Sequence, residues 1–341
     1  YDGKEEASIV LLDVSNGSVL AMAGGRQDKT QSLCYNRAVS ALRQPGSCIK
    51  MLGEYAAGID TGAFHLGTVF DDAPTTYDNG KEIRNAYRSF KGKMTLDKAI
   101  CLSTNTVALN AYRQVGEDTV FSYLKAFGLD DLTDQDKNEA LSIGGSHNGV
   151  TNLQMTAAYN AIAAGGLYTK PYYYTTVKDH DGNVILSHEE DYHRVIKEET
   201  AVLLTSAMNH VMTEGTGTDA CFNTLPLAGK SGTTNDNRDL WFMGYSPYFT
   251  CGVWGGFDDN SPQQSSSYVK YLWKNVMERV NDNFKWKDFD QSALTKISIC
   301  EKCGNRAVEG LCDQTVQGNM VRTIGNIRQE IMIGNFMSEF R

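Results

Sequence analysis

The chain has 341 residues, of which 41% are hydrophobic and 21% are charged, and its formal net charge is −9. This balance is typical of a globular protein large enough to bury a sizeable core. An acidic chain lacks the basic face that nucleic-acid binding needs, so we expect no nucleic-acid partner.

The chain starts with Tyr1-Asp2-Gly3-Lys4, without Met and without an apolar leader, and no run of residues is long and apolar enough to cross a bilayer. We therefore expect a piece of a longer protein, whose membrane anchor would lie outside this sequence.

The N-terminal part predicts a hairpin and then a helix. Two apolar runs within residues 7–24 flank Asn16-Gly17, a pair that favours a tight turn with positive φ at both central residues. Pro45-Gly46 ends any regular element. Residues 47–57 then predict a helix with Ser47 at its start.

The middle of the chain is predicted to be mainly helical. Residues 61–93 are irregular, and residues 95–116 have a helical pattern that Ser103-Thr104-Asn105 interrupts, which places these three on a short loop between two helices. The remaining predictions here are helices at 118–127, 151–164 and 198–213, and a minor hairpin at 177–186.

The C-terminal part supplies further strands and then turns polar. Three apolar runs within residues 225–256 predict consecutive antiparallel strands, so we expect a sheet built from residues 8–24 and 225–256 and flanked by helices. Beyond residue 257 the chain is polar, with Ser265-Ser266-Ser267. We predict one domain over residues 1–295 and a tail over residues 296–341 that contains a cysteine cluster.

Three short motifs occur in order: Ser47-x-x-Lys50, Ser103-x-Asn105 and Lys230-Ser231-Gly232-Thr233. Each alone is weak, because Ser-x-x-Lys recurs at Ser122 and Ser267, and Ser-x-Asn recurs at Ser146. Context favours the first set, since only Ser47 follows a Pro-Gly turn at a predicted helix start.

The chemistry of acyl transfer requires these groups together. Ser47 and Lys50, three residues apart on a helix, share one face. A serine hydroxyl is a weak nucleophile until a base removes its proton, and a lysine can be that base only when it is neutral. Burial and a second cation at Lys230 would both favour the neutral form. An exposed strand edge at residues 230–234 would bind an extended peptide.

With the flanking residues included, the chain resembles the transpeptidase domain of class A penicillin-binding proteins. The resemblance covers roughly residues 7–260 and includes Arg43-Gln44-Pro45-Gly46-Ser47 and the segments 149–159, 228–234 and 239–247. It implies an α/β (α+β type) fold, with a five-stranded antiparallel sheet flanked by helices and an all-helical subdomain. One departure is Met51, where the family usually has Pro.

The resemblance also implies roles by position. Ser47 would be the acylated nucleophile, Lys50 its base and Ser103 the proton relay to the leaving amine. Substrate would be bound by the other motif residues, namely Asn105, Lys230, Ser231, Gly232, Thr233 and Thr234. The backbone N–H groups of Ser47 and Thr233 would form the oxyanion hole.

The implied reaction is cross-linking of peptidoglycan stem peptides. The donor would end in D-Ala-D-Ala, the acceptor would be an amine, and β-lactams would mimic the donor. The resemblance further implies a glycosyltransferase domain and a membrane anchor outside this sequence, and a place at the extracytoplasmic face of a bacterial membrane. No metal or other cofactor is expected.

Two other functions remain open, a β-lactamase and a penicillin-sensing receptor domain. The first is disfavoured because the Glu-x-x-x-Asn signature of class A lactamases is absent between Ser103 and Lys230. The cluster of Cys300, Cys303 and Cys312 leaves alternatives open too: a disulfide, free thiols, or a zinc site that lacks a nearby fourth ligand.

Overall fold

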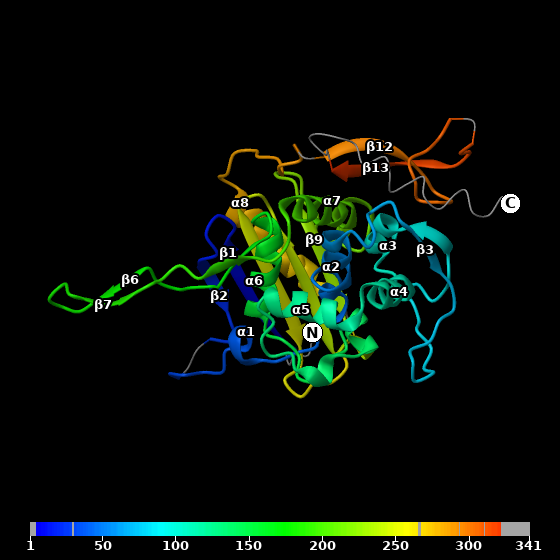
Figure 1. The fold of residues 1–341 in the computed structure, drawn as a ribbon. Helices are drawn as coiled ribbons and strands as arrows, with labels where there is room; N and C mark the ends of the chain where they lie inside the picture. The colour runs from blue at the N-terminus through cyan, green and yellow to red at the C-terminus, as the bar shows by residue number, and fades with distance from the viewer. Residues whose placement is uncertain (1–4, 29–30, 265–266, 293, 310, 322–341) are drawn as a thin grey trace.

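The computed structural model describes residues 5–28, 31–264, 267–292, 294–309 and 311–321. A five-stranded sheet with the order β2-β1-β11-β10-β9 lies at its centre, and each neighbouring pair runs antiparallel (Figure 1). The strands are β1 (Glu6–Asp13), β2 (Val19–Ala23), β9 (Ala228–Thr233), β10 (Asp239–Tyr245) and β11 (Phe249–Gly256). The predicted five-stranded antiparallel sheet is thereby confirmed.

Helices cover both faces of this sheet. The α-helices of the described part are α1 (Arg37–Ser40), α2 (Glu54–Thr61), α3 (Leu96–Leu102), α4 (Asn105–Val115), α5 (Glu117–Ala126), α6 (Asn152–Ala163), α7 (Glu198–Glu214) and α8 (Tyr268–Asn281). Short 3-10 helices are η1 (Gly46–Met51), η2 (Asp134–Asp136), η3 (Glu139–Ile143), η4 (Thr218–Ala220) and η5 (Asn235–Asn237). The helices predicted at 118–127, 151–164 and 198–213 are confirmed as α5, α6 and α7.

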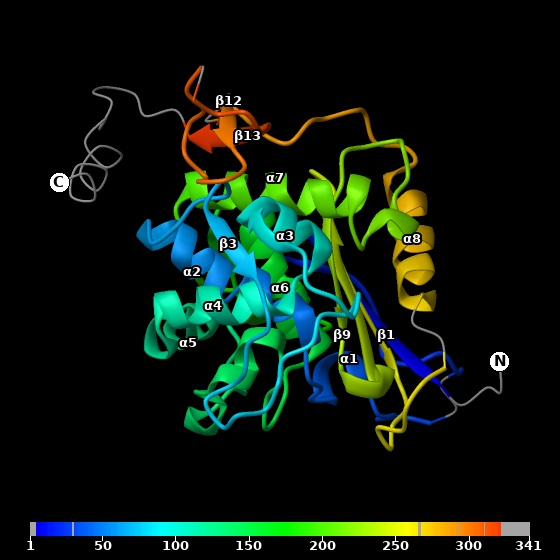
Figure 2. The same cartoon turned by 90° about the vertical axis from the view of Figure 1, so that its right-hand side faces the viewer.

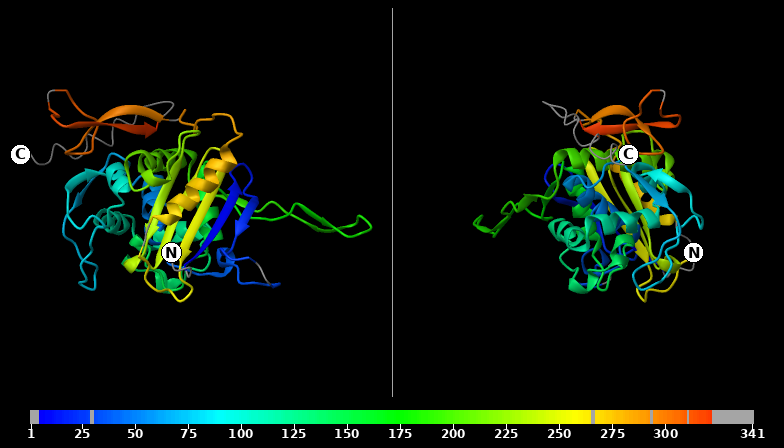
Figure 3. Two further views of the ribbon diagram at one scale, coloured as in Figure 1. Left: turned by 180° about the vertical axis from the view of Figure 1, so that it is seen from behind. Right: turned by 45° about the vertical axis from the view of Figure 1, so that its right-hand side comes forward.

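The sheet separates two hydrophobic cores, because successive side chains of a strand point to opposite faces. On β10, Trp241 and Met243 pack into the larger core with α6 and α7, whereas Leu240 and Phe242 pack on the other face. There Phe242 meets Trp273 of α8 edge-on, with ring centroids 5.1 Å apart. Figures 2 and 3 show α8 on this face, while α6, α7 and the helices α2 to α5 lie on the opposite side.

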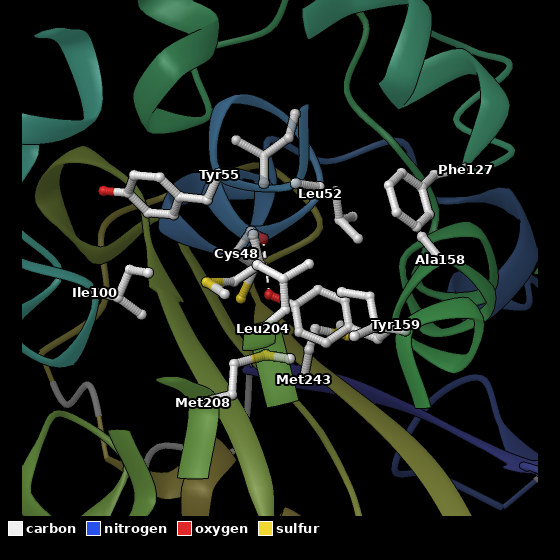
Figure 4. Packing of buried hydrophobic residues seen from close by; sticks show 14 of the residues in the cluster. Cys48, Leu52, Tyr55, Ile100, Phe127, Ala158, Tyr159, Leu204, Met208 and Met243 are labelled. Carbon is white, nitrogen blue, oxygen red and sulfur yellow. Dashed lines mark hydrogen bonds between the residues drawn. The ribbon is translucent and has the colours of Figure 1, made fainter. Parts of the chain in front are cut away.

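The larger core anchors the segment that carries the first motif. Cys48, which follows Ser47, is fully buried against Tyr159 of α6 and Met243 of β10 (Figure 4). The Tyr159 hydroxyl donates a hydrogen bond to the Cys48 carbonyl at 2.8 Å. The Cys48 thiol donates to the Lys230 carbonyl of β9 at 3.4 Å. These contacts hold Ser47 between the helical side and the edge of the sheet.

Two local predictions were wrong. The first hairpin has a longer loop, since Asp13 N bonds to Ser18 O at 3.0 Å. Of the pair Asn16-Gly17, only Gly17 has positive φ, and the Asn16 side chain accepts a hydrogen bond from Ser18 N instead. Residues 47–57 are also not one helix: η1 ends at Met51 and α2 begins at Glu54. Gly53 lies at this break, where a Cβ would be 3.1 Å from a methyl group of Val120 on α5.

Several elements were missed by the sequence reasoning. Residues 61–93, predicted to be irregular, contain β3 (Val69–Asp72), which pairs with β4 (Gly92–Thr95). Helix α8 was not predicted, although its buried residues Val269, Trp273 and Met277 recur at every fourth position. That spacing is the signal that indicates an amphipathic helix. Ser265 and Ser266 lie outside the described residues.

Three further two-stranded sheets complete the fold. They are β5 (Leu167–Thr169) with β8 (Tyr192–Arg194), β6 (Thr176–Lys178) with β7 (Val184–Ser187), and β12 (Leu294–Cys300) with β13 (Thr315–Val321). The β6–β7 hairpin confirms the one predicted at 177–186, and it projects away from the body (Figure 1).

The C-terminal hairpin of β12 and β13 contacts α7, and the Asn319 side chain donates to Ser206 at 2.6 Å. The predicted boundary at residue 295 therefore falls inside β12, next to Leu294, which belongs to the larger core. The division into a domain and a tail stays a prediction, and residues 322–341 of that tail lie outside the described part.

Candidate active site

The position of Ser47 follows from backbone contact between η1 and β9. Gly46 has φ +52°, a left-handed conformation that favours glycine, and a Cβ there would lie 2.9 Å from the backbone N and O of Thr233. A Cβ on Gly232 would lie 2.6 Å from the carbonyl oxygen of Pro45. The absence of side chains at these two positions lets the segment that begins with Ser47 lie directly against the strand that carries the third motif.

The second motif lies where two helices meet, as predicted. Helix α3 ends at Leu102, Ser103 is left-handed with φ +57°, and Asn105 is the first residue of α4. The side-chain nitrogen Nζ of Lys50 donates to the Ser103 carbonyl at 3.0 Å and to Asn105 Oδ1 at 2.6 Å. The sharp turn at Ser103 thus brings the first and second motifs together.

Lys230 joins the third motif to the second. Its side chain is fully buried, and its Nζ donates to the Ser103 hydroxyl at 2.8 Å and to the Ser231 carbonyl at 2.9 Å. Ser103 is therefore contacted by both motif lysines, by Lys50 through its carbonyl and by Lys230 through its hydroxyl.

Strand β9 is an edge strand of the sheet, as predicted. Thr234 N bonds to Asp239 O at 3.0 Å, so the N–H of the preceding Thr233 points away from β10. The outer edge of β9 therefore presents backbone donors beside the first residues of η1, whose own N–H groups have no acceptor within that short helix.

Burial shifts the pKa values of both lysines. Lys50 is fully buried, and its pKa lies well below the ordinary value because of desolvation and then the charge of Lys230. Desolvation likewise lowers the pKa of Lys230 to about 8. Both side chains therefore lose their protons more readily than an exposed lysine does.

A cleft opens over these groups in two connected sections. The larger section has a volume of about 1550 Å³ and the smaller one about 480 Å³. Ser47, Asn105, Thr233 and Thr234 line both sections, so the half-buried Ser47 lies where they meet. Ser103 and Ser231 line the larger section only.

Two predicted residues already have partners. The Ser231 hydroxyl donates to Thr216 Oγ1 at 2.9 Å. The Thr234 hydroxyl accepts from Asp239 N at 2.8 Å, which turns it towards the sheet. Thr216 lines the larger section of the cleft and had no role assigned from sequence, although it lies in a Gly-Thr-Gly segment.

The serines of the two alternative Ser-x-x-Lys copies lie apart from this cluster. Ser122 is on α5, where its hydroxyl donates to the Thr119 carbonyl. Ser267 directly precedes α8. Its motif partner Lys270 pairs with Asp219 and lines the larger section of the cleft. Neither of these two serines lines either section of the cleft around Ser47.

Within the described residues, no group of three or more His, Cys, Asp or Glu side chains is arranged to hold a metal ion. Cys300 is buried, Cys312 is partly exposed and Cys303 is exposed, and all three are free thiols in this structure. No helix in the described part of the chain has the length and apolar character needed to cross a membrane.

The sheet, its flanking helices and the cleft define the β-lactamase-like fold of penicillin-binding transpeptidase domains. The family described as penicillin binding protein transpeptidase domain matches residues 7–278, and the chain belongs to this family. A curated relative, penicillin-binding protein 1A of Clostridium tetani, is 34% identical over 332 residues, which cover 89% of this chain and 42% of that protein. The chain thus spans less than half the length of this relative.

Solved structures share the fold. Penicillin-binding protein 1A from Haemophilus influenzae superposes with a TM-score of 0.80 at 22% identity, covering 93% of this chain and 53% of that one. The PonA1 protein from Mycobacterium tuberculosis, solved in complex with penicillin V, gives a TM-score of 0.74 at 22% identity, with 84% and 81% covered.

Proposed function

We propose that this domain is a serine D,D-transpeptidase that cross-links peptidoglycan stem peptides through an acyl-enzyme on Ser47. The observation that carries the proposal is the placement of Lys50. It is fully buried on the same short helix as Ser47, and its pKa is lowered by burial and by Lys230. A lysine whose pKa is lowered in this way can act as a base towards the Ser47 hydroxyl.

The hydrogen bonds of Lys50 support this role. A neutral amine has two N–H bonds and one lone pair. The two acceptors around Nζ, the Ser103 carbonyl and Asn105 Oδ1, use both N–H bonds. The lone pair is left to take the proton of the Ser47 hydroxyl.

The reaction then proceeds in two acyl transfers. Ser47 Oγ attacks the carbonyl between the two D-Ala residues while its proton passes to Lys50. The backbone N–H groups of Ser47 and Thr233 stabilise the oxyanion. The C–N bond breaks, the departing D-Ala amine receives a proton through the Ser103 hydroxyl, and an ester on Ser47 remains.

The second transfer reverses these roles. An acceptor amine attacks the ester carbonyl and loses a proton, the Ser47 oxygen leaves and is protonated again, and a cross-linked amide is the product. The ammonium of Lys230, which donates to Ser103, keeps positive charge beside the Ser231 and Thr233 positions that would bind the donor carboxylate.

β-Lactams would enter the same cleft as donor mimics and stay on Ser47. The family name and the complex of PonA1 with penicillin V support this part of the proposal. We also propose that the whole protein works at the extracytoplasmic face of a bacterial membrane, with a glycosyltransferase domain and an anchor elsewhere in its chain.

The test is intact-mass spectrometry after incubation with benzylpenicillin, followed by peptide mapping. A single stable adduct is expected on Ser47, and Ser47→Ala should remove it. Rapid release of the adduct as hydrolysed drug would indicate a β-lactamase instead. No adduct, or an adduct on a different residue, would refute the assignment of Ser47.

A further inference from the structure

The side-chain amide of Asn105 is held at both ends. Its Oδ1 accepts a hydrogen bond from Lys50 Nζ at 2.6 Å, and its Nδ2 donates one to the Arg84 carbonyl at 2.7 Å. The amide nitrogen has two hydrogens, so one of them remains for a ligand in the cleft. The Arg84 carbonyl thereby decides which end of the amide faces Lys50 and in which direction the second hydrogen points.

Asn85, the residue after Arg84, binds the start of α4. Its Oδ1 accepts from the backbone N of Asn105 at 2.8 Å and from that of Thr106 at 3.4 Å. The N-cap residue Thr104 makes no capping hydrogen bond with its own side chain. Asn85, twenty positions earlier in the chain, thus satisfies the helix N-terminus in place of the usual capping residue.

Asp72 anchors Asn85 in turn. The fully buried carboxylate accepts from Asn85 Nδ2 at 2.7 Å, from the Thr106 hydroxyl at 2.6 Å, from the Tyr87 hydroxyl at 2.6 Å and from Lys91 N at 2.8 Å. No ion pair of the described residues includes it. Burial raises its pKa, but the hydrogen bonds from Thr106 and Tyr87 outweigh this and leave the pKa below the ordinary value.

We propose that Asn85, anchored by Asp72, is a positioning residue that aims the free Nδ2 hydrogen of Asn105 at an amide carbonyl of the bound substrate. The class of ligand group is an acylamino group, the amide that a stem peptide has before its terminal D-Ala and that benzylpenicillin has beside its β-lactam ring. This inference rests on the proposed function, since it assigns part of the same substrate site.

The test compares two β-lactams with the same ring system. Benzylpenicillin has the acylamino group, whereas 6-aminopenicillanic acid has a bare amine in its place. Asn85→Ala should slow acylation by benzylpenicillin about ten-fold more than acylation by 6-aminopenicillanic acid, the factor for one hydrogen bond. Acylation rates would be measured by intact mass at matched fractions of folded protein. An equal loss for both drugs would overturn the proposal, because it would mean a general structural defect.

Three further variants sharpen this result. In an Asn105→Ala background, Asn85→Ala should cause no further change in the ratio of the two acylation rates, since Asn85 acts through Asn105. Tyr87→Phe removes the hydroxyl that donates to Asp72 and keeps the aromatic ring. This variant should fold, and it should slow acylation by benzylpenicillin more than acylation by 6-aminopenicillanic acid, but by a smaller factor than Asn85→Ala does. Asn281→Ala deletes an equally buried amide of α8, far from the cleft, and should lower stability without changing the ratio of the two rates.

The outcomes separate the two proposals. If neither drug acylates the wild-type chain, the proposed function fails. If both acylate it but Asn85→Ala and Tyr87→Phe leave the ratio unchanged, or the double variant shows additive discrimination, only the role of Asn85 is refuted.

Discussion

Lys230 allows a prediction about pH. Its pKa is lowered to about 8 by burial, so its ammonium is lost within the range in which proteins are commonly assayed. If this charge binds the carboxylate of a β-lactam, acylation should fall above pH 8. At pH 9 about one tenth of Lys230 keeps its proton, so the second-order acylation constant should be about ten-fold below its value at neutral pH. An arginine at this position stays protonated throughout, so Lys230→Arg should lose the descending limb.

The assay is stopped-flow acylation with a fluorescent penicillin between pH 6 and pH 10. The shapes of the two plots of acylation constant against pH are compared rather than their heights. An arginine in a fully buried site is larger than the lysine it replaces, so it will lower the maximum acylation constant by disturbing the packing. Melting curves at pH 7 and pH 9 are the control. A lowered lysine pKa means that the unfolded chain binds more protons between about pH 8 and pH 10.4, so stability linked to Lys230 rises with pH in that window.

Loss of folding linked to Lys230 therefore does not explain a fall in acylation at pH 9. The reasoning is refuted if Lys230→Arg keeps the same descending limb. It is equally refuted if the wild-type rate stays level up to pH 9.5.

Three more predictions concern the first motif and residues close to it in the chain. Lys50→Arg should fold but acylate about 10²–10⁴-fold more slowly, because arginine is not a base; near-normal gel-based acylation would contradict that role. Glu54 is almost fully buried, one of its carboxylate oxygens lacks a hydrogen-bond partner, and burial raises its pKa well above the ordinary value. Wild type should therefore lose stability relative to Glu54→Gln as the pH rises above the unfolded-state pKa of about 4.3, by up to about 1.4 kcal/mol per pH unit. The measurement is urea unfolding of both proteins at pH 5 and pH 6. A difference in unfolding free energy that stays constant between the two pH values would exclude this prediction. Gly46→Ala should lower the free energy of unfolding by at least about 1–2 kcal/mol and slow acylation, because the new Cβ would meet the Thr233 backbone. An unchanged melting temperature and acylation rate would argue against the close contact of η1 with β9.

The sequence by itself was informative wherever the signal is local. Apolar runs within 240–245 and 249–254 predicted two strands correctly, because a short continuous apolar run bounded by turn residues is typical of a strand buried on both faces. The turn residues Pro45-Gly46 and the Ser-x-x-Lys spacing placed Ser47 and Lys50 on one short helical segment. The segments that flank the motifs then indicated the family, which the family match over residues 7–278 confirms.

Only the tertiary structure decided how the three motifs meet and what holds them. The left-handed Ser103 accepts a hydrogen bond from Lys50 at its carbonyl and one from Lys230 at its hydroxyl. Asp72 and Asn85 have no motif of their own and reach α4 from 20 to 34 positions away in sequence. Such contacts depend on how β3 packs against α4, which no local pattern encodes. The lowered pKa of Lys50 is of the same kind, because it results from burial by residues distant in the chain, and a sequence contains no measure of burial at a single position.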